Sequence, residues 1–279
     1  MSTLLATLAN NLFLFFGTAV FGCIAILTGI LGPRVAGPSL ATRLWARGLL
    51  LTGGIRLDVR FERPLDPDAV YVFLCNHQGL FDIPVLLWTL PERTRFLAKR
   101  SLFHIPVFGW SLKIMGFIPV DRGDRGRARE SLEEAVRQLE AGTSILIFPE
   151  QTRSGDGRIL PFRRGGFVIA QKAGVPLVPI GLDGTRRIRP KGSLLVRPGR
   201  VRVRYGEPIP MPRGDGARVG RELVDEVRHR IAGLAGASLS DVAEPAESDA
   251  ADDAEQGTAA APPAATDAAA QRQGPQRGG

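Results

Sequence analysis

The sequence predicts an α/β fold in which a mostly parallel or mixed sheet is covered by helices, preceded by an N-terminal membrane helix or helical hairpin. Two observations support this prediction. Between about Ile55 and Leu234, short apolar stretches alternate with helical ones, and several are apolar throughout, as when both faces of a sheet are covered. Ahead of them, twenty uncharged residues run from Leu12 to Leu31, matching the roughly 20 residues that cross a hydrocarbon core.

The apolar run from Leu12 to Leu31 is interpreted as a membrane anchor. The preceding residues, MSTLLATLANN, contain no Lys or Arg, whereas a cleaved signal peptide has a basic start. Glycines within the run and Gly32-Pro33 after it keep a second interpretation open, a helical hairpin that enters one leaflet. Either form predicts association with a membrane, the inner or plasma membrane if the source is a bacterium.

The first basic residues all follow the apolar run: Arg34, Arg43, Arg47 and Arg56. The positive-inside rule therefore predicts that the rest of the chain faces the cytoplasm. Residues 38–52 have leucines and Trp45 among arginines, a pattern typical of an amphipathic helix at a membrane interface or of an ordinary surface helix.

Three regions follow from these patterns: a membrane anchor with an amphipathic helix at 1–54, a catalytic domain at 55–235 and a disordered tail at 236–279. The tail is rich in Ala, Pro, Asp, Glu and Gln and has almost no large apolar residues. In the domain we expect seven strands, RLDVRF, VYVFLC, TRFLA, GFIPV, SILIF, PLVPIGL and RVRVRY. We expect helices at FDIPVLLWTL, VFGWSLKIM, RARESLEEAVRQLEAG, GGFVIAQKAG and residues 214–233.

Charge and cysteine content restrict the classes of function. The chain has a net charge of +8, but the part after Gly236 has eight acids and two arginines, which leaves +14 on the rest. A basic body predicts an anionic partner, such as a phosphorylated substrate, a lipid surface or nucleic acid. The two cysteines, Cys23 and Cys75, cannot supply a disulfide framework or a four-cysteine zinc site.

Reactive side chains follow three of the expected strands. VYVFLC runs into Asn76 and His77, GFIPV into Asp121 and Arg122, and SILIF into PEQTRS. Ligands bind at the carboxyl ends of parallel strands in open α/β sheets, so we expect these clusters to converge on one site.

His77 and Asp82 are candidates for a catalytic pair. Five residues apart, they lie about 140° apart on a regular helix and cannot pair there. Gly79 permits a turn, and Pro84 suits the first turn of a helix that begins near Asp82, so the carboxylate can fold back onto the imidazole. Asp82 would then orient His77 as a general base. The alternative is that Asp82 only caps the helix and His77 is an ordinary loop residue.

The sequence offers no serine nucleophile in a G-x-S-x-G motif, and Cys75 closes an apolar strand where burial is expected. We therefore expect direct attack by an acceptor hydroxyl without an acyl-enzyme. Arg122, Arg153 and Lys99 follow strands, where guanidinium and ammonium groups can bind phosphate. Glu150 beside them is expected to hold an arginine or to bind an acceptor hydroxyl.

Four blocks of the sequence resemble the glycerolipid acyltransferase family typified by 1-acylglycerol-3-phosphate O-acyltransferase. NHQGLFD is similar to the family's N-H-x4-D, GFIPVDR to its glycine-to-arginine block, FPEQTRS to its F-P-E-G-T-R-S, and VPLVPI to its valine-proline block. The resemblance covers about residues 56–206. Gln151 departs from the pattern, because the family usually has glycine there.

The resemblance implies that His77 is the base and Asp82 its partner. It also implies an acceptor site, whose residues are Asn76, Lys99, Arg122, Glu150, Thr152 and Arg153. The expected reaction moves an acyl group from acyl-CoA or acyl carrier protein to the sn-2 hydroxyl of lysophosphatidic acid, forming phosphatidic acid in phospholipid biosynthesis, with no metal or other cofactor.

Other functions remain open at this point. The acceptor is alternatively glycerol 3-phosphate, another lysophospholipid or a lyso-aminolipid, and Gln151 beside the phosphate site leaves its headgroup undecided. A remote alternative is a membrane-tethered basic protein that binds without turnover. Nucleic acid is not expected as a partner, because the sequence has few tyrosines and tryptophans and no recognised nucleic-acid motif.

Overall fold

A computed structural model describes residues 2–32, 37–121, 124–190, 192–211, 213 and 219–239. The described helices are α1 (Thr3–Ile30), α2 (Gly37–Thr52), α3 (Asp82–Thr89), α4 (Phe108–Ile114), α5 (Arg125–Glu140), α6 (Gly165–Ala173), α7 (Thr185–Ile188) and α8 (Arg221–Ala235), with a 3₁₀ turn, η1, at Arg100–His104. The described strands are β1 (Ile55–Phe61), β2 (Val72–Cys75), β3 (Thr94–Lys99), β4 (Ile118–Val120), β5 (Ser144–Ile147), β6 (Leu177–Asp183) and β7 (Gly199–Tyr205). A strand forms within each of the seven predicted stretches.

The seven strands form one mixed sheet in the order β1-β7-β6-β2-β5-β3-β4. Neighbouring strands are parallel except β6 and β7, which are antiparallel. The carboxyl ends of β6, β2, β5, β3 and β4 consequently lie along the same edge of the sheet. The predicted α/β class and mixed sheet are confirmed.

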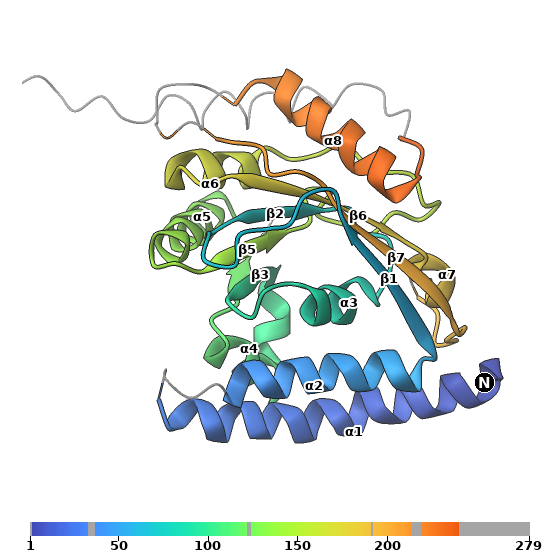
Figure 1. The fold of residues 1–279 in the computed structure, drawn as a ribbon. Helices are drawn as coiled ribbons and strands as arrows, with labels where there is room; N and C mark the ends of the chain where they lie inside the picture. Colours follow the sequence, from blue (N-terminus) through green and yellow to red (C-terminus); the bar gives the residue numbers. More distant parts are fainter. Residues whose placement is uncertain are drawn as a thin grey trace, which may run out of the picture. The chain divides into compact units, whose positions relative to one another are not determined.

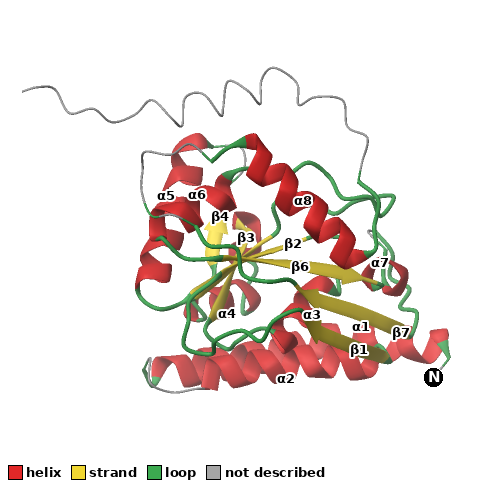
Figure 2. Cartoon of the chain, turned by 45° about the horizontal axis from the view of Figure 1, so that its top comes forward, coloured by secondary structure: helices red, strands yellow, loops and turns green. Residues whose placement is uncertain are grey.

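Helices cover both faces of the sheet (Figures 1 and 2). On one face, α2, α3 and α4 pack with the sheet in an apolar core that includes Leu49, Phe73, Val85 and Leu112. On the other face, α5, α6 and α8 pack in a second core around Leu74. β2 contributes to both cores, because alternate side chains of a strand point to opposite faces. All four β2 residues are therefore buried and apolar.

The N-terminal helices form a hairpin, with α2 lying beside α1 in the opposite direction (Figure 1). Gly48 of α2 permits close contact, since a Cβ there would lie 2.0 Å from the Phe13 ring. Asn10 of α1 donates hydrogen bonds to the Leu49 carbonyl (2.8 Å) and the Thr52 hydroxyl (3.0 Å). This polar contact within an apolar pair fixes how the two helices meet.

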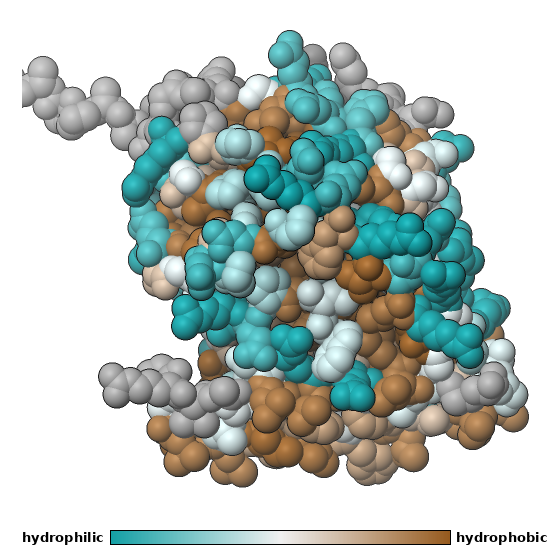
Figure 3. Space-filling model, in the orientation of Figure 1, coloured by the Kyte–Doolittle hydropathy of each residue, from teal (hydrophilic) through white to brown (hydrophobic). Residues whose placement is uncertain are grey.

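Among the described residues, α1 is the one helix that is long and apolar enough to cross a membrane. Its outer face is exposed and apolar, with Leu12 61% and Phe15 73% exposed. Apolar side chains gather over the hairpin, while the surface above it is largely hydrophilic (Figure 3). A surface of this kind indicates association with a membrane.

Two boundaries differ from the sequence prediction. The last helix begins at Arg221 rather than at residue 214, with Gly220 at its N-cap. The ordered chain also continues past Gly236, because the Ile159 N–H donates to the Ser238 carbonyl at 3.0 Å. The remainder of the predicted tail, residues 240–279, lies outside the described residues.

Candidate active site

The turn after β2 joins His77 to Asp82. The buried Asp82 carboxylate accepts hydrogen bonds at one oxygen, Oδ2, from His77 Nδ1 (2.7 Å) and from the backbone N–H groups of Gln78 (2.7 Å) and Gly79 (2.9 Å). Its other oxygen, Oδ1, is buried and has no hydrogen-bond partner among the described residues. The carboxylate thus folds back from the first residue of α3 onto the strand end.

Gly79 allows this turn to lie directly against α7. A Cβ at position 79 would approach the backbone carbonyl of Thr185 to 2.8 Å, closer than side-chain atoms normally come to backbone. Any larger residue would push the turn away from α7. Gly79 is therefore required by a close approach, and its φ is not in the left-handed region.

The geometry leaves one imidazole nitrogen of His77 available. With Nδ1 bound to Asp82, Nε2 is the nitrogen able to accept a proton. The ring stacks on Phe148 with centroids 4.2 Å apart, and its side chain is 19% exposed. Phe148 is not among the predicted site residues; in the sequence it is marked only by its place at the end of an apolar strand, directly before Pro149.

Glu150 holds the backbone of the His77 turn. Its Oε1 accepts from the His77 N–H (2.7 Å), and its Oε2 accepts from the Leu160 N–H (2.9 Å). Burial raises the pKa of Glu150 to about 7, the two backbone hydrogen bonds oppose this, and the nearby Asp82 charge raises the pKa further. Because both oxygens bind backbone, Glu150 acts on the site through His77.

The loop after β5 is also tied to the His77 turn. Ser154 donates its backbone N–H to the His77 carbonyl at 3.1 Å, and the Gln78 side chain donates to the Gly157 carbonyl at 2.9 Å. Gln151 in this loop has φ +58°, a left-handed conformation that favours glycine. The position where the sequence departs from the family's glycine is thus one where glycine is the less strained residue.

Asn76 and Cys75 lie behind the site. Asn76 is fully buried and exchanges two hydrogen bonds with the Leu182 backbone, at 2.9 and 2.7 Å, which join β2 to β6. These bonds give Asn76 a structural role, whereas the resemblance implies that it binds the acceptor. Cys75 is fully buried, and its burial raises the thiol pKa well above the usual value, so its thiolate is disfavoured.

The predicted cationic and polar residues lie at neighbouring strand ends. Lys99 ends β3 and is exposed, Thr152 is exposed in the loop after β5, and Arg153 beside it is half-buried. β3 lies beside β5, and β5 beside β2. Because neighbouring strands are about 4.8 Å apart, Lys99 starts roughly 10 Å from the strand that carries His77. Arg122 lies outside the described residues.

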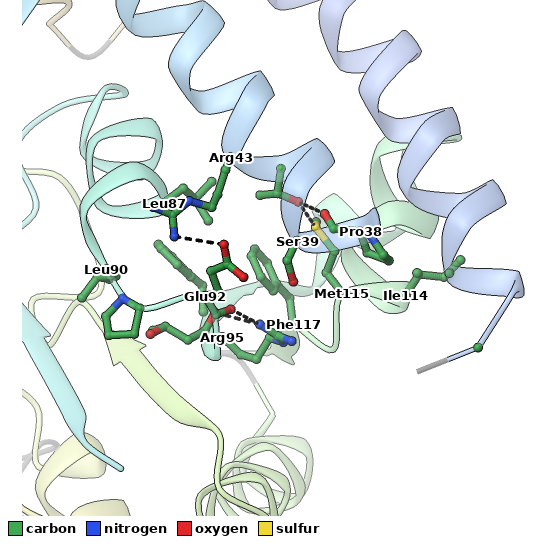
Figure 4. Close-up of a pocket in the computed structure, with 16 residues that line it drawn as sticks. Pro38, Ser39, Arg43, Leu87, Leu90, Glu92, Arg95, Ile114, Met115 and Phe117 are labelled. Carbon is green, nitrogen blue, oxygen red and sulfur yellow. Dashed lines mark hydrogen bonds and ion pairs between the residues drawn. The ribbon is translucent and has the colours of Figure 1, made fainter. Parts of the chain in front are cut away.

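A cavity of about 210 Å³ lies elsewhere, between the hairpin and the domain (Figure 4). Its lining includes Leu90 after α3 and Thr94 at the start of β3, both at the amino end of the parallel strands. His77 follows the carboxyl end of β2. This cavity is therefore distinct from the site around His77. In the described part of the chain, no three His, Cys, Asp or Glu side chains are grouped to hold a metal ion.

Comparison with known proteins finds similar acyltransferases. Residues 56–183 match the Acyltransferase family. The chain is 41% identical to the chloroplastic 1-acyl-sn-glycerol-3-phosphate acyltransferase BAT2 of Brassica napus, over 68% of this chain and 54% of that protein. It is 34% identical to the alpha form from Bos taurus, over 64% and 62%. The chain thus spans about half to two thirds of these curated relatives.

A solved structure is also similar. The crystal structure of the 1-acyl-sn-glycerophosphate (LPA) acyltransferase PlsC from Thermotoga maritima matches with a TM-score of 0.71 and 26% identity, covering 83% of this chain and 94% of that one. The match extends well beyond residues 56–183. These findings confirm the resemblance that the four sequence blocks predict: residues 56–183 match the Acyltransferase family, and the similar proteins are named 1-acylglycerol-3-phosphate acyltransferases.

Proposed function

We propose that this chain transfers a fatty acyl group from an acyl thioester to the free sn-2 hydroxyl of 1-acylglycerol 3-phosphate, forming phosphatidic acid. The observation that carries the proposal is the 2.7 Å contact between His77 Nδ1 and Asp82 Oδ2 at the carboxyl edge of the sheet. The names of the similar Brassica napus, Bos taurus and Thermotoga maritima proteins support the same acceptor.

The proposed mechanism is direct transfer. His77 Nε2 takes the proton of the acceptor hydroxyl while the hydroxyl oxygen attacks the thioester carbonyl carbon. The carbon–sulfur bond then breaks, and the leaving thiolate receives the proton from His77. Asp82 stabilises the positive imidazolium between these steps, because its carboxylate binds Nδ1. The burial of Cys75 argues against an acyl-enzyme on its thiol.

Acceptor binding is assigned to the cationic and polar residues around this pair. Thr152 and Arg153 lie in the loop after β5, and Lys99 ends β3. Arg122 is included on the basis of the sequence pattern. Glu150 is assigned a positioning role through the His77 backbone. The donor is acyl-CoA or acyl carrier protein.

The hairpin is proposed to lie in one leaflet, with the domain of residues 55–239 on the same side of the membrane as the N-terminus. α1 contacts the domain at both ends: Thr7 accepts from the Val196 N–H at 3.0 Å, and Gly29 packs against Ile114. A helix held along its length in this way lies along the domain rather than projecting from it. A tag placed before Ser2 should therefore be accessible from the same side of the membrane as the domain, whereas a spanning helix would place it on the opposite side.

Turnover by membranes that carry the full chain tests the proposed function. Lysophosphatidic acid, glycerol 3-phosphate, other lysophospholipids and a lyso-aminolipid are offered with each thioester donor. We expect turnover with lysophosphatidic acid, its loss by about 10²–10⁴ in His77→Ala, and near wild-type rates in Cys75→Ser. Turnover by folded His77→Ala near the wild-type rate, or acyl label trapped on Cys75, would exclude this mechanism.

A further inference from the structure

Arg189 is a buried arginine at the edge of the candidate site. It follows α7, the short helix that packs against Gly79 of the catalytic turn. Only 6% of Arg189 is exposed. Arginine is rarely buried to this degree unless its charge is paired, because removing a cation from water is costly.

The contacts of Arg189 do not supply that pairing. Its Nε donates to the Ser193 carbonyl at 2.9 Å, while its NH1 is buried and has no hydrogen-bond partner in the described part of the chain. Among the described residues, no carboxylate forms an ion pair with it. Arg187, two residues earlier, differs in both respects: its side chain is 70% exposed and binds Asp183 at 2.9 Å.

A second arginine, Arg153, lies in a loop that contacts α7. Arg153 follows β5, and no hydrogen bond or ion pair within the described residues occupies its guanidinium. The loop that carries it is joined to α7, because Arg186 donates to the Gly155 carbonyl at 3.0 Å. Burial lowers the pKa of Arg189, and the positive charge of Arg153 lowers it further, as expected when two cations lie close together. Two interacting guanidiniums that form no ion pair within the described residues make a site for an anion.

We propose that Arg189 and Arg153 together bind the terminal phosphate of the acceptor, and that Arg189 makes the site select a phosphomonoester over a phosphodiester headgroup. This inference rests on the proposed function, and it adds a residue that none of the four sequence blocks contains. A phosphomonoester carries about −1.5 to −2 charges near neutral pH, which matches two guanidiniums. A phosphodiester carries one charge and lacks the third terminal oxygen.

The location of Arg189 suits an acceptor held in a membrane. The loop that follows it contains Leu194, which is 72% exposed, and the Leu194 carbonyl accepts from Asn11 of α1 at 2.9 Å. Arg189 therefore lies between the His77 turn and the exposed apolar end of the hairpin. The headgroup of a lipid acceptor enters the site from this side.

Arg189→Met in the full chain tests the proposal, with Arg187→Met as the matched control. Met fills similar space without charge, so we expect the KM for lysophosphatidic acid to rise about ten- to a hundredfold while the donor KM stays unchanged. The preference for lysophosphatidic acid over lysophosphatidylglycerol should fall by a similar factor. Arg187→Met should keep both within about twofold, and Arg189→Lys, which keeps the charge without the fork, should lie between wild type and Arg189→Met.

The opposite result identifies a structural role. If Arg189 only braces its loop through Ser193, Arg189→Met and Arg189→Lys lower the melting temperature but keep the acceptor KM and the headgroup preference of the wild type, which overturns the inference. Protection against heat by inorganic phosphate provides a readout that does not depend on turnover. Protection of wild type but not of Arg189→Met supports the phosphate site even if wild type does not acylate lysophosphatidic acid, and equal protection of both overturns it.

Discussion

Replacing Asp82 by Asn is expected to slow acyl transfer about a thousandfold while the domain stays folded. The amide oxygen can occupy the position of Oδ2 and accept from His77 Nδ1 and from the backbone N–H groups of Gln78 and Gly79. The shape of the turn is therefore kept. The negative charge is lost, and the amide NH₂ takes the position of Oδ1, which is buried without a partner.

The magnitude follows from the charge that develops on His77 during proton transfer. With charge centres about 4 Å apart and an effective dielectric constant of about 20, the attraction between imidazolium and carboxylate is about 4 kcal/mol. Each 1.36 kcal/mol of barrier is a factor of about ten in rate, which gives a loss of roughly 10³. The buried NH₂ should lower the free energy of unfolding by about 1–3 kcal/mol.

The assay is kcat with saturating lysophosphatidic acid and donor, for Asp82→Asn, His77→Ala and the double variant, with a thermal melt of each. Asp58→Asn is the control, because Asp58 binds Arg204 at 2.9 Å on the sheet, away from the His77 turn. Since His77 and Asp82 act as one unit, the double variant should be little slower than His77→Ala alone. A folded Asp82→Asn within tenfold of wild type, or losses that add in the double variant, would refute this reasoning.

Four further predictions concern stability and the membrane. Because burial raises the folded-state pKa of Glu150 from 4.5 to about 7, the folded state holds the proton more tightly, so the unfolding free energy should fall as pH rises across this interval. Denaturant melts should show this fall in wild type and not in Glu150→Gln. Gln151→Gly should raise the unfolding free energy by about 0.5–1 kcal/mol by relieving the φ of +58°, whereas Gln151→Ala should bring no such gain. The double variant Phe15→Glu/Phe16→Glu should bind vesicles at least tenfold more weakly, measured by flotation in high salt. Vesicle binding at the wild-type level would argue against burial of this face in lipid. Deleting residues 240–279 should leave the melting temperature and kcat nearly unchanged, and a large loss of either would show that this segment docks on the domain.

The strands were predictable because their signal is local. VFLC is apolar at every position and SILI is apolar after its serine, and both strands are buried on both faces. The His77–Asp82 pairing was also within reach, because Gly79 and Pro84 in the intervening turn supply the required bend. The start of α8 was less accessible, since the residues before Arg221 include glycine and charged residues that suit either a helix or a loop.

The remaining features depend on contacts between residues far apart in the sequence. The sequence places Asn76 in a predicted catalytic motif. Its hydrogen bond to the Leu182 backbone is apparent only once β2 is paired with β6. In the sequence, Phe148 resembles an ordinary strand residue. Its stacking on His77 becomes apparent only when β5 is placed beside β2. Arg189 belongs to a stretch of several arginines, and it differs from the nearby Arg187 in being buried and in lacking the ion pair that Arg187 forms with Asp183. Such distinctions follow from strand order, which local patterns do not determine.

Glu150 connects two of the sequence blocks, because it lies in FPEQTRS and binds the backbone of His77 in NHQGLFD. The carboxylate of Glu150 accepts from the His77 N–H, and the loop after Glu150 donates back through Ser154 N–H to the His77 carbonyl. Both contacts are to backbone, so they persist whatever side chain stands at position 77. The β5 loop therefore sets where the imidazole lies, while Asp82 sets how it is turned. Since the same loop carries Arg153, we expect a shift of Glu150 to move His77 and the proposed phosphate ligand Arg153 together, so that the acceptor hydroxyl would stay aligned with His77.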